Sequence, residues 1–90
     1  MSPTAKPKTK TVRSREAKAF GSVLQGLRAT QGLSQEELAF RSDTNRTYVS
    51  DLERGIKEPC LAMLFRIAEA LETSPSLMLQ PVEFALRRRK

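Results

Sequence analysis

The sequence contains no histidine, no tryptophan and a single cysteine, Cys60. Without histidine and with one thiol, the chain cannot form an internal disulfide, a cysteine–histidine zinc site or a Cys–His catalytic pair. It also has no carboxylate pair and no glycine-rich phosphate loop to which a reaction could be assigned. These absences predict a protein that is not an enzyme and that holds no metal and no cofactor.

Long apolar runs are absent as well. No run approaches the roughly 20 residues that cross a bilayer, and the N-terminal stretch lacks the apolar segment of a secretory signal. With 90 residues, 39% of them hydrophobic, four phenylalanines and one tyrosine, the chain can bury a small core but not a deep active site. We therefore expect one small soluble domain, and the single cysteine fits the reducing cytoplasm.

Acidic residues are missing from both ends of the chain, which is where the net charge of +6 arises. Residues 1–15 carry five cations and residues 87–90 carry four, whereas the segment between them carries seven cations and ten acids. The composition of the first stretch predicts a disordered basic arm over 1–15, because so few apolar side chains cannot repay the entropy of ordering. Basic ends favour nucleic acid as the partner, although solvated tails have the same composition.

Between these ends, apolar residues recur at the spacing of helices, and no stretch has the alternation of a strand. The pattern predicts a first helix over about 16–31, which Gly32 ends. Ser34 and Glu37 then form an S-x-x-E capping box, in which each side chain accepts the other residue's free backbone N–H. This box places the start of a second helix at Ser34, and the helix runs to about Arg41.

A short turn separates the second helix from a third. The turn formers "SDTN" occupy 42–45, and Asn45 is a good N-cap for a helix over about 46–54 that Gly55 ends. A connection of about three or four residues between two helices is typical of a helix-turn-helix unit.

Two further helices complete the expected all-α chain. Apolar residues keep helical spacing over 61–71, and Ser74 with the proline after it supplies the start of a fifth helix. Pro81 interrupts that run, so the fifth helix either ends there or is kinked. We expect a folded domain over 16–80 and a C-terminal extension over 81–90 that is a candidate dimerisation segment with a basic tail.

The third helix has one apolar side and one polar side. At about 100° per residue, Val49 and Leu52 face the rest of the domain. The opposite, polar side presents Thr47, Ser50 and Arg54, with Asp51 and Arg46 on its flanks. An ordinary solvated face has the same polarity, so this helix alone leaves its use open. The capped helix and short turn before it favour DNA, because that geometry lays a second helix in the major groove.

Three stretches in one register carry a family resemblance. They are "LRATQGLSQEELA" from residue 27, "YVSDLERG" from residue 48 and "PCLAMLFRIAEAL" from residue 59. Over roughly residues 20–80 the chain resembles the lambda-repressor/Cro-like helix-turn-helix regulators, also called the xenobiotic-response-element family. Its "SDTNRTYVSDLERG" looks most like the controller proteins of restriction-modification systems. The resemblance implies a compact five-helix lambda-repressor-like domain and regulation of transcription through double-stranded DNA.

The resemblance also implies a role for each matching residue. Arg46, Thr47 and Ser50 would reach base edges, and Arg46 is suited to bidentate pairing with a guanine. Contacts to the DNA backbone would come from Gln35, Arg41, Asn45, Tyr48, Arg54 and Lys57. Gln35 would also brace the third helix, and Arg28 and Glu53 would form a structural ion pair between the first and third helices.

The chain departs from the family pattern at several positions. Asp43 and Glu72 stand where glycine is common. Asp43 can take a left-handed backbone position at modest cost, whereas Glu72 fits such a position less well, so the sequence leaves the exact end of the fourth helix open. Cys60 replaces the usual serine or threonine cap of the fourth helix, which predicts a poorly capped start. Phe40 and Phe65 fall at positions that are usually polar or variable, so we expect either to be exposed.

One recognition helix reads too few base pairs to find a single operator, which predicts a two-fold homodimer on a pseudo-palindrome. By resemblance, the dimer interface would use the fifth helix and the segment after it. The candidate interface residues are Leu77, Met78, Val82 and Phe84, which are apolar in excess of the needs of so small a core. We expect no small-molecule ligand and no membrane contact, and a protein that associates with the bacterial nucleoid when bound to DNA.

A second function class stays open at this point. Small helix-turn-helix domains also serve as protein-interaction modules, such as antitoxins or coactivator bridges, and bind a partner protein through an apolar surface. Burial of Phe40, Phe65 or the segment 77–86 by a partner would favour that class. The operator sequence, and whether binding activates or represses, cannot be inferred from the residues.

Overall fold

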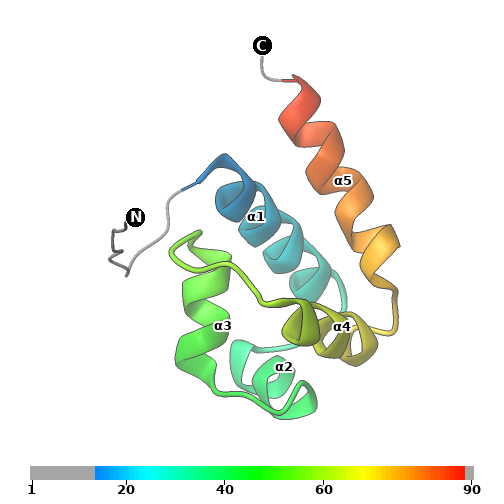
Figure 1. Ribbon diagram of the computed structural model, residues 1–90. Helices are drawn as coiled ribbons and strands as arrows, with labels where there is room; N and C mark the ends of the chain where they lie inside the picture. The colour runs from blue at the N-terminus through cyan, green and yellow to red at the C-terminus, as the bar shows by residue number, and fades with distance from the viewer. Residues whose placement is uncertain (1–13, 89–90) are drawn as a thin grey trace.

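The computed structural model describes residues 14–88, which fold into a bundle of five helices (Figure 1). The helices are α1 (Arg15–Thr30), α2 (Gln35–Arg41), α3 (Arg46–Glu53), α4 (Leu61–Ala70) and α5 (Pro75–Arg88). No strand occurs over this range, so the all-α fold is confirmed. Residues 1–13 of the arm expected over 1–15, and the last two residues of the basic tail, lie outside the described residues.

Local capping signals set where the helices begin. The Ser34 side chain accepts from the Glu37 N–H at 3.0 Å and Glu37 Oε1 accepts from the Ser34 N–H at 2.9 Å, which confirms the capping box. Asn45 Oδ1 accepts from the Tyr48 N–H at 2.8 Å, which confirms the cap of α3. Cys60 makes no capping hydrogen bond through its side chain, as expected.

The first helix starts slightly earlier than its composition suggested. Ser14 Oγ accepts from the Ala17 N–H at 2.9 Å, and the Arg15 guanidinium donates to the Leu86 carbonyl of α5 at 3.0 Å. Ser14 and Arg15 therefore belong to the folded domain and not to the arm. A composition average over 1–15 could not detect a single capping serine at its end.

The fifth helix continues through Pro81, so it neither ends there nor leaves 81–88 as a separate extension. Proline removes one backbone donor from the helix. That loss is tolerated here because Met78 and Val82, which flank Pro81, are buried at 1% and 6% exposure and hold both halves on the core. The packing of α5 along α1 thus extends the helix past its proline (Figure 1).

Two non-glycine residues adopt left-handed backbone conformations, of which the sequence predicted only that Asp43 would tolerate one. Asp43 has φ 61° in the turn between α2 and α3, and Glu72 has φ 58° just beyond α4. The Glu72 N–H donates to the Glu69 carbonyl and the Thr73 N–H to the Ala68 carbonyl, the two bonds that close a helix of this kind. Glu72 therefore takes the terminating position that glycine commonly fills.

The core lies where the helices meet, and α1 is its central element. This helix packs against α3 on one side and α5 on the other, while α2 packs against α3 and α4. The largest fully buried side chains are Leu24, Leu38, Val49, Leu52, Ile67, Leu71 and Met78. Because Val49 and Leu52 are completely buried, the inner side of α3 is fixed and its opposite side faces outward. None of the helices over 14–88 is long and apolar enough to span a bilayer.

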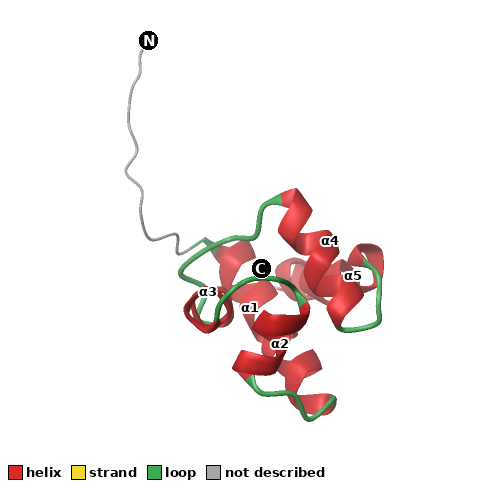
Figure 2. Cartoon of the chain, turned by 90° about the horizontal axis from the view of Figure 1, so that it is seen from below, coloured by secondary structure: helices red, strands yellow, loops and turns green. Residues whose placement is uncertain are grey.

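Gly21 allows α3 to approach α1 closely (Figure 2). A Cβ atom at this position would lie 2.5 Å from the Leu52 carbonyl oxygen and 2.6 Å from that of Glu53. Both atoms belong to the backbone at the end of α3, so they cannot rotate away. Gly26, in the same helix, has no heavy atom within 4 Å of such a Cβ.

We expect Gly21→Ala to destabilise the domain by about 1 to 3 kcal/mol, because the added methyl group must push α3 away from α1. Gly26→Ala is the matched control and should stabilise the domain by about 0.5 to 1 kcal/mol through helix propensity. Equilibrium unfolding in urea measures both. Equal stabilisation by the two alanines would show that α1 and α3 are not in close backbone contact.

Candidate nucleic-acid interface

The candidate interface is the outward side of α3 together with the residues at its two ends. Arg46 and Thr47 are exposed in the first turn of the helix, and Ser50 is half-buried one turn further on. All three therefore lie on the surface of the domain, on a helix whose inner side is occupied by the core. Their roles toward base edges remain predictions.

The first turn of α3 is electropositive. An α-helix leaves its first backbone N–H groups without acceptors inside the helix, and Asn45 satisfies that of Tyr48. The N–H groups of Arg46 and Thr47 also belong to this first turn, and the Arg46 side chain adds a full positive charge there. Arg41, at the end of α2, is exposed as well. This end of α3 is suited to bind a phosphate oxygen.

Tyr48 belongs to this first turn and is half-buried. The Lys57 Nζ lies 5.8 Å from the centre of the Tyr48 ring, within range of a cation–π contact. Burial raises the pKa of the Tyr48 phenol, and the Cys60 thiol adds to the shift while Arg66 opposes it. The hydroxyl is therefore protonated at neutral pH and able to donate a hydrogen bond to a phosphate.

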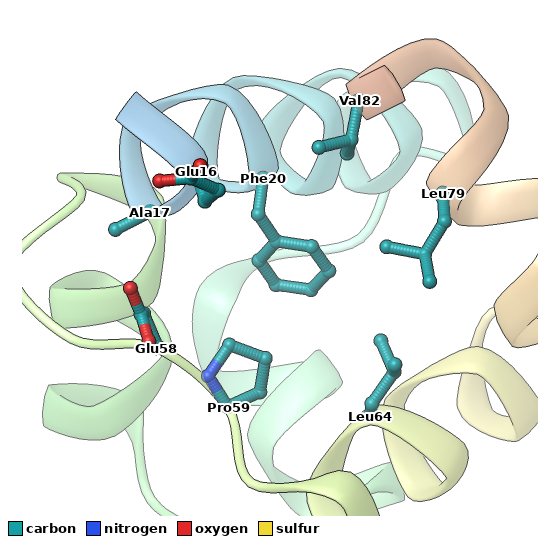
Figure 3. A pocket seen from close by; sticks show the side chains of 8 residues that line it. All are labelled: Glu16, Ala17, Phe20, Glu58, Pro59, Leu64, Leu79 and Val82. Atoms are coloured by element: carbon teal, nitrogen blue, oxygen red, sulfur yellow. The ribbon is translucent and has the colours of Figure 1, made fainter. Parts of the chain in front are cut away.

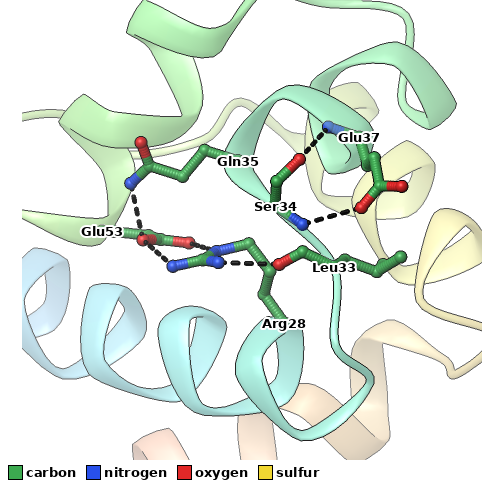
Figure 4. A network of polar contacts seen from close by, with 6 residues as sticks. All are labelled: Arg28, Leu33, Ser34, Gln35, Glu37 and Glu53. Atoms are coloured by element: carbon green, nitrogen blue, oxygen red, sulfur yellow. Dashed lines mark hydrogen bonds and ion pairs between the residues drawn. The ribbon is translucent and has the colours of Figure 1, made fainter.

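A polar network behind α3 joins three helices (Figure 4). Arg28 of α1 makes two hydrogen bonds to Glu53 of α3, from Nε to Oε2 at 2.6 Å and from Nη2 to Oε1 at 3.1 Å. Arg28 Nη1 also donates to the Leu33 carbonyl at 2.8 Å. The hydrogen bond to Glu53 is the main reason why the pKa of Arg28 is raised, so the guanidinium stays charged.

Gln35 of α2 completes this network, because its Nε2 donates to Glu53 Oε1 at 2.9 Å. The Glu53 side chain is only 3% exposed and the Arg28 side chain 15% exposed, so the pair is largely shielded from water. The structure thus brings Arg28, Gln35 and Glu53 together and fixes the end of α3 relative to α1 and α2. The contact of Gln35 with DNA remains a prediction.

The cations at the other end of α3 surround Asp51, whose role the sequence left open. Arg54 Nη1 lies 3.6 Å from Asp51 Oδ1, and Lys57 Nζ lies 3.5 Å from Asp51 Oδ2. The Asp51 side chain is 17% exposed, compared with 63% for Arg54 and 49% for Lys57. No helical-wheel argument could find this cluster, since Lys57 lies beyond the end of the helix.

Gly21 is the second residue that sequence reasoning missed. It makes no polar contact, yet it sets how closely α3 sits on α1. A glycine in the interior of a helix was the available signal, because such a residue costs stability unless packing requires it.

The four candidate dimer residues divide into two groups. Leu77 and Phe84 are 57% and 65% exposed on α5. Met78 and Val82 are instead buried within the protomer, so the expectation that they form a dimer surface is wrong. These side chains were expected to exceed the needs of so small a core, whereas α5 packs along α1 and needs an apolar side for that contact.

The domain also has an apolar hollow of about 250 Å³ that is remote from the outward side of α3 (Figure 3). It lies between α1, α4, α5 and the loop before α4, and its lining comes from Ala17, Phe20, Pro59, Leu64, Leu79 and Val82, with Glu16 and Glu58 at the edge. It offers few polar groups to orient a ligand. Over residues 14–88, no group of three or more potential metal ligands occurs.

Comparisons of the sequence with known proteins identify its relatives. A helix-turn-helix family model covers residues 24–78 of the chain. The HTH-type transcriptional regulator y4dJ of Sinorhizobium fredii is 38% identical over 66 residues, which are 73% of this chain and 86% of that protein. Control protein C.BamHI of Bacillus amyloliquefaciens is 39% identical over 61 residues, which are 67% of this chain and 75% of that protein.

A solved structure agrees with the same assignment. The restriction-modification controller protein C.AhdI from Aeromonas hydrophila superposes with a TM-score of 0.70 at 38% identity, covering 72% of this chain and 98% of that one. The fold and the outward α3 thus define a DNA-binding helix-turn-helix domain. The chain belongs to the helix-turn-helix family of transcriptional regulators, of the xenobiotic-response-element type, and its predicted likeness to restriction-modification controllers is confirmed.

We expect Glu53→Gln to destabilise the domain by about 3 kcal/mol, because it leaves the shielded Arg28 guanidinium without a counter-charge. Glu83→Gln is the matched control: Glu83 pairs with Arg87 at 3.0 Å on the surface of α5, and both side chains are exposed. Loss of this exposed Glu83–Arg87 pair should lower the free energy of unfolding by about 0.3 to 0.5 kcal/mol. Urea unfolding compares the two variants, and similar small costs would contradict a structural role for the Arg28–Glu53 pair.

Proposed function

We propose that this regulator binds a specific pseudo-palindromic operator as a homodimer, with α3 in the major groove. One observation carries the proposal: α3 presents Arg46, Thr47 and Ser50 outward while its inner side and its C-terminal end are fixed to the bundle. Side chains that read base edges must be held on a rigid element, because a loosely held helix would have to be ordered on binding, at a cost in free energy.

The proposed contacts divide along α3. Arg46 pairs with a guanine through two hydrogen bonds, and Thr47 and Ser50 contact neighbouring base edges. The remaining residues hold the protein in register through the phosphates; they are Gln35, Arg41, Asn45, Tyr48, Arg54 and Lys57. The cations at the two ends of the chain add phosphate affinity that does not depend on sequence and that weakens with salt. Bound to its operator, the protein would sit on the bacterial nucleoid.

The proposed dimer surface is narrower than the sequence suggested. Leu77 and Phe84 are seven residues apart on α5, which places them on the same side of the helix, and both are exposed. The Phe84 ring also lies 5.7 Å from the Arg88 guanidinium. A two-fold contact along this side of α5 would cover both apolar side chains and would place two copies of α3 on one DNA molecule.

Selection of bound sequences from a random DNA pool tests the proposal and supplies the operator. On that operator we expect Arg46→Ala to weaken binding by about 1 to 3 kcal/mol while leaving affinity for unrelated DNA nearly unchanged, because the contact with the guanine forms only on the operator. Arg54→Ala is the matched control, and should weaken binding to both DNAs alike. Equal losses from the two variants on both DNAs would contradict base reading by Arg46.

Sedimentation measurements test the dimer. We expect the parent protein to sediment as a dimer at micromolar concentration. Phe84→Ser should shift it toward monomer, because the substitution removes the exposed ring that the partner protomer would cover. Phe65→Ser, which removes an exposed phenylalanine from α4, is the control and should leave the dimer intact. A monomeric parent protein would refute this surface.

A second function, binding a partner protein through the same domain, is favoured by a different observation. Three large apolar side chains are exposed: Phe40 at the end of α2 is 85% exposed, Phe65 on α4 is 56% exposed, and Leu61 is 71% exposed. Large apolar side chains left on the surface are common at protein contacts. If the selection from the random DNA pool enriches no sequence, this second function is favoured over operator binding.

A further inference from the structure

Asp51 is a carboxylate on the helix proposed to enter the major groove, where the surrounding partner would be polyanionic. Asp51 Oδ1 lies 3.6 Å from Arg54 Nη1, and Asp51 Oδ2 lies 3.5 Å from Lys57 Nζ, so the carboxylate bridges both cations. The Asp51 side chain is far more covered than either of its partners, since only 17% of it is exposed. The negative charge is thus held inward while the two positive charges remain accessible.

The backbone of Asp51 strengthens this arrangement. Its carbonyl accepts from the Ile56 N–H at 2.9 Å, and the Gly55 N–H donates to the Leu52 carbonyl at 3.1 Å, so the chain turns back on the end of α3. Gly55 adopts φ 75° at this turn. Lys57 is thereby returned to the side of Asp51, although it lies outside the helix.

We propose that Asp51 is a positioning residue that sets specificity, because it holds Arg54 and Lys57 in one arrangement for the phosphates and lowers the affinity for DNA of unrelated sequence. This inference rests on the proposed operator binding. It differs from a role in which Asp51 itself accepts a hydrogen bond from a base.

The physical argument compares the two kinds of DNA. On the operator the register is fixed, so pre-positioned cations lose little side-chain freedom when they meet their phosphates, and this gain offsets the repulsion from Asp51. On unrelated DNA no register is fixed, so pre-positioning gains little and the repulsion remains. The carboxylate therefore weakens the unwanted complexes more than the operator complex.

The test is Asp51→Asn, which removes the charge and keeps the shape. We expect affinity for unrelated DNA to rise by about two- to fivefold, because Arg54 and Lys57 would no longer be paired with a carboxylate and exposed ion pairs have this strength. The salt dependence on that DNA should steepen by about 0.9 in its log–log slope, which corresponds to one further phosphate contact. Operator affinity should change by less, so the ratio of the two affinities falls.

Three comparisons make the outcome decisive. Asp51→Glu, which keeps the charge, should retain most of the ratio. Glu83→Gln, on α5, removes the same charge from a helix with no close packing on α3 and should leave the ratio unchanged. In a Lys57→Met background the effect of Asp51→Asn should shrink, because one of the held cations is already gone. Urea unfolding checks that each variant is folded.

Several results would overturn the inference. These are an unchanged ratio in Asp51→Asn, the same fall of the ratio in Glu83→Gln, or an undiminished effect in the Lys57→Met background. If the DNA pool selected by Asp51→Asn differs from the parent's at one base pair only, Asp51 reads a base instead. If the parent protein selects no sequence at all, the proposed function fails; if it does select one while the ratio is unchanged, only the role of Asp51 fails.

Discussion

The largely shielded pair of Arg28 and Glu53 is the interaction on which the position of α3 depends. A carboxylate that is 3% exposed is costly unless a charged, hydrogen-bonded partner meets it, and the bidentate guanidinium provides that partner. Because Gln35 donates to the same carboxylate, one buried charge fixes α1, α2 and α3 together. The geometry of the helix-turn-helix unit is therefore specified by a polar contact as well as by apolar packing.

Apolar packing and close backbone contact supply the other constraints on α3. Val49 and Leu52 anchor its inner side, and Gly21 lets its C-terminal end rest against α1. With three attachments on one side, the helix has little freedom to rotate, and its outward residues keep a defined direction. A short helix of this kind has little stability of its own, so its usefulness to a DNA-binding protein comes from the bundle that holds it.

Positive charge is concentrated at the two ends of the chain. The ends of the chain hold nine cations and no acid, whereas the segment between them carries more acids than cations. Near α3, the two cations at its C-terminal end share one covered carboxylate, Asp51. In the proposed complex with DNA, the termini supply most of the general attraction to the phosphates, and the covered Asp51 carboxylate limits binding at the many wrong sites of a genome.

Much of this architecture follows from local patterns in the sequence. The caps at Ser34 and Asn45, the turn between α2 and α3, and the outward placement of Arg46 and Thr47 depend on residues within a few positions of one another, and they were predicted correctly. The burial of Met78 and Val82 and the surroundings of Asp51 were not, and the sequence left open whether the fifth helix ends at Pro81 or continues past it. Helical periodicity shows which residues share a side, but it does not show which side meets another helix or which distant side chain lies opposite. Those outcomes depend on contacts between segments far apart in the chain, which form only when the helices pack.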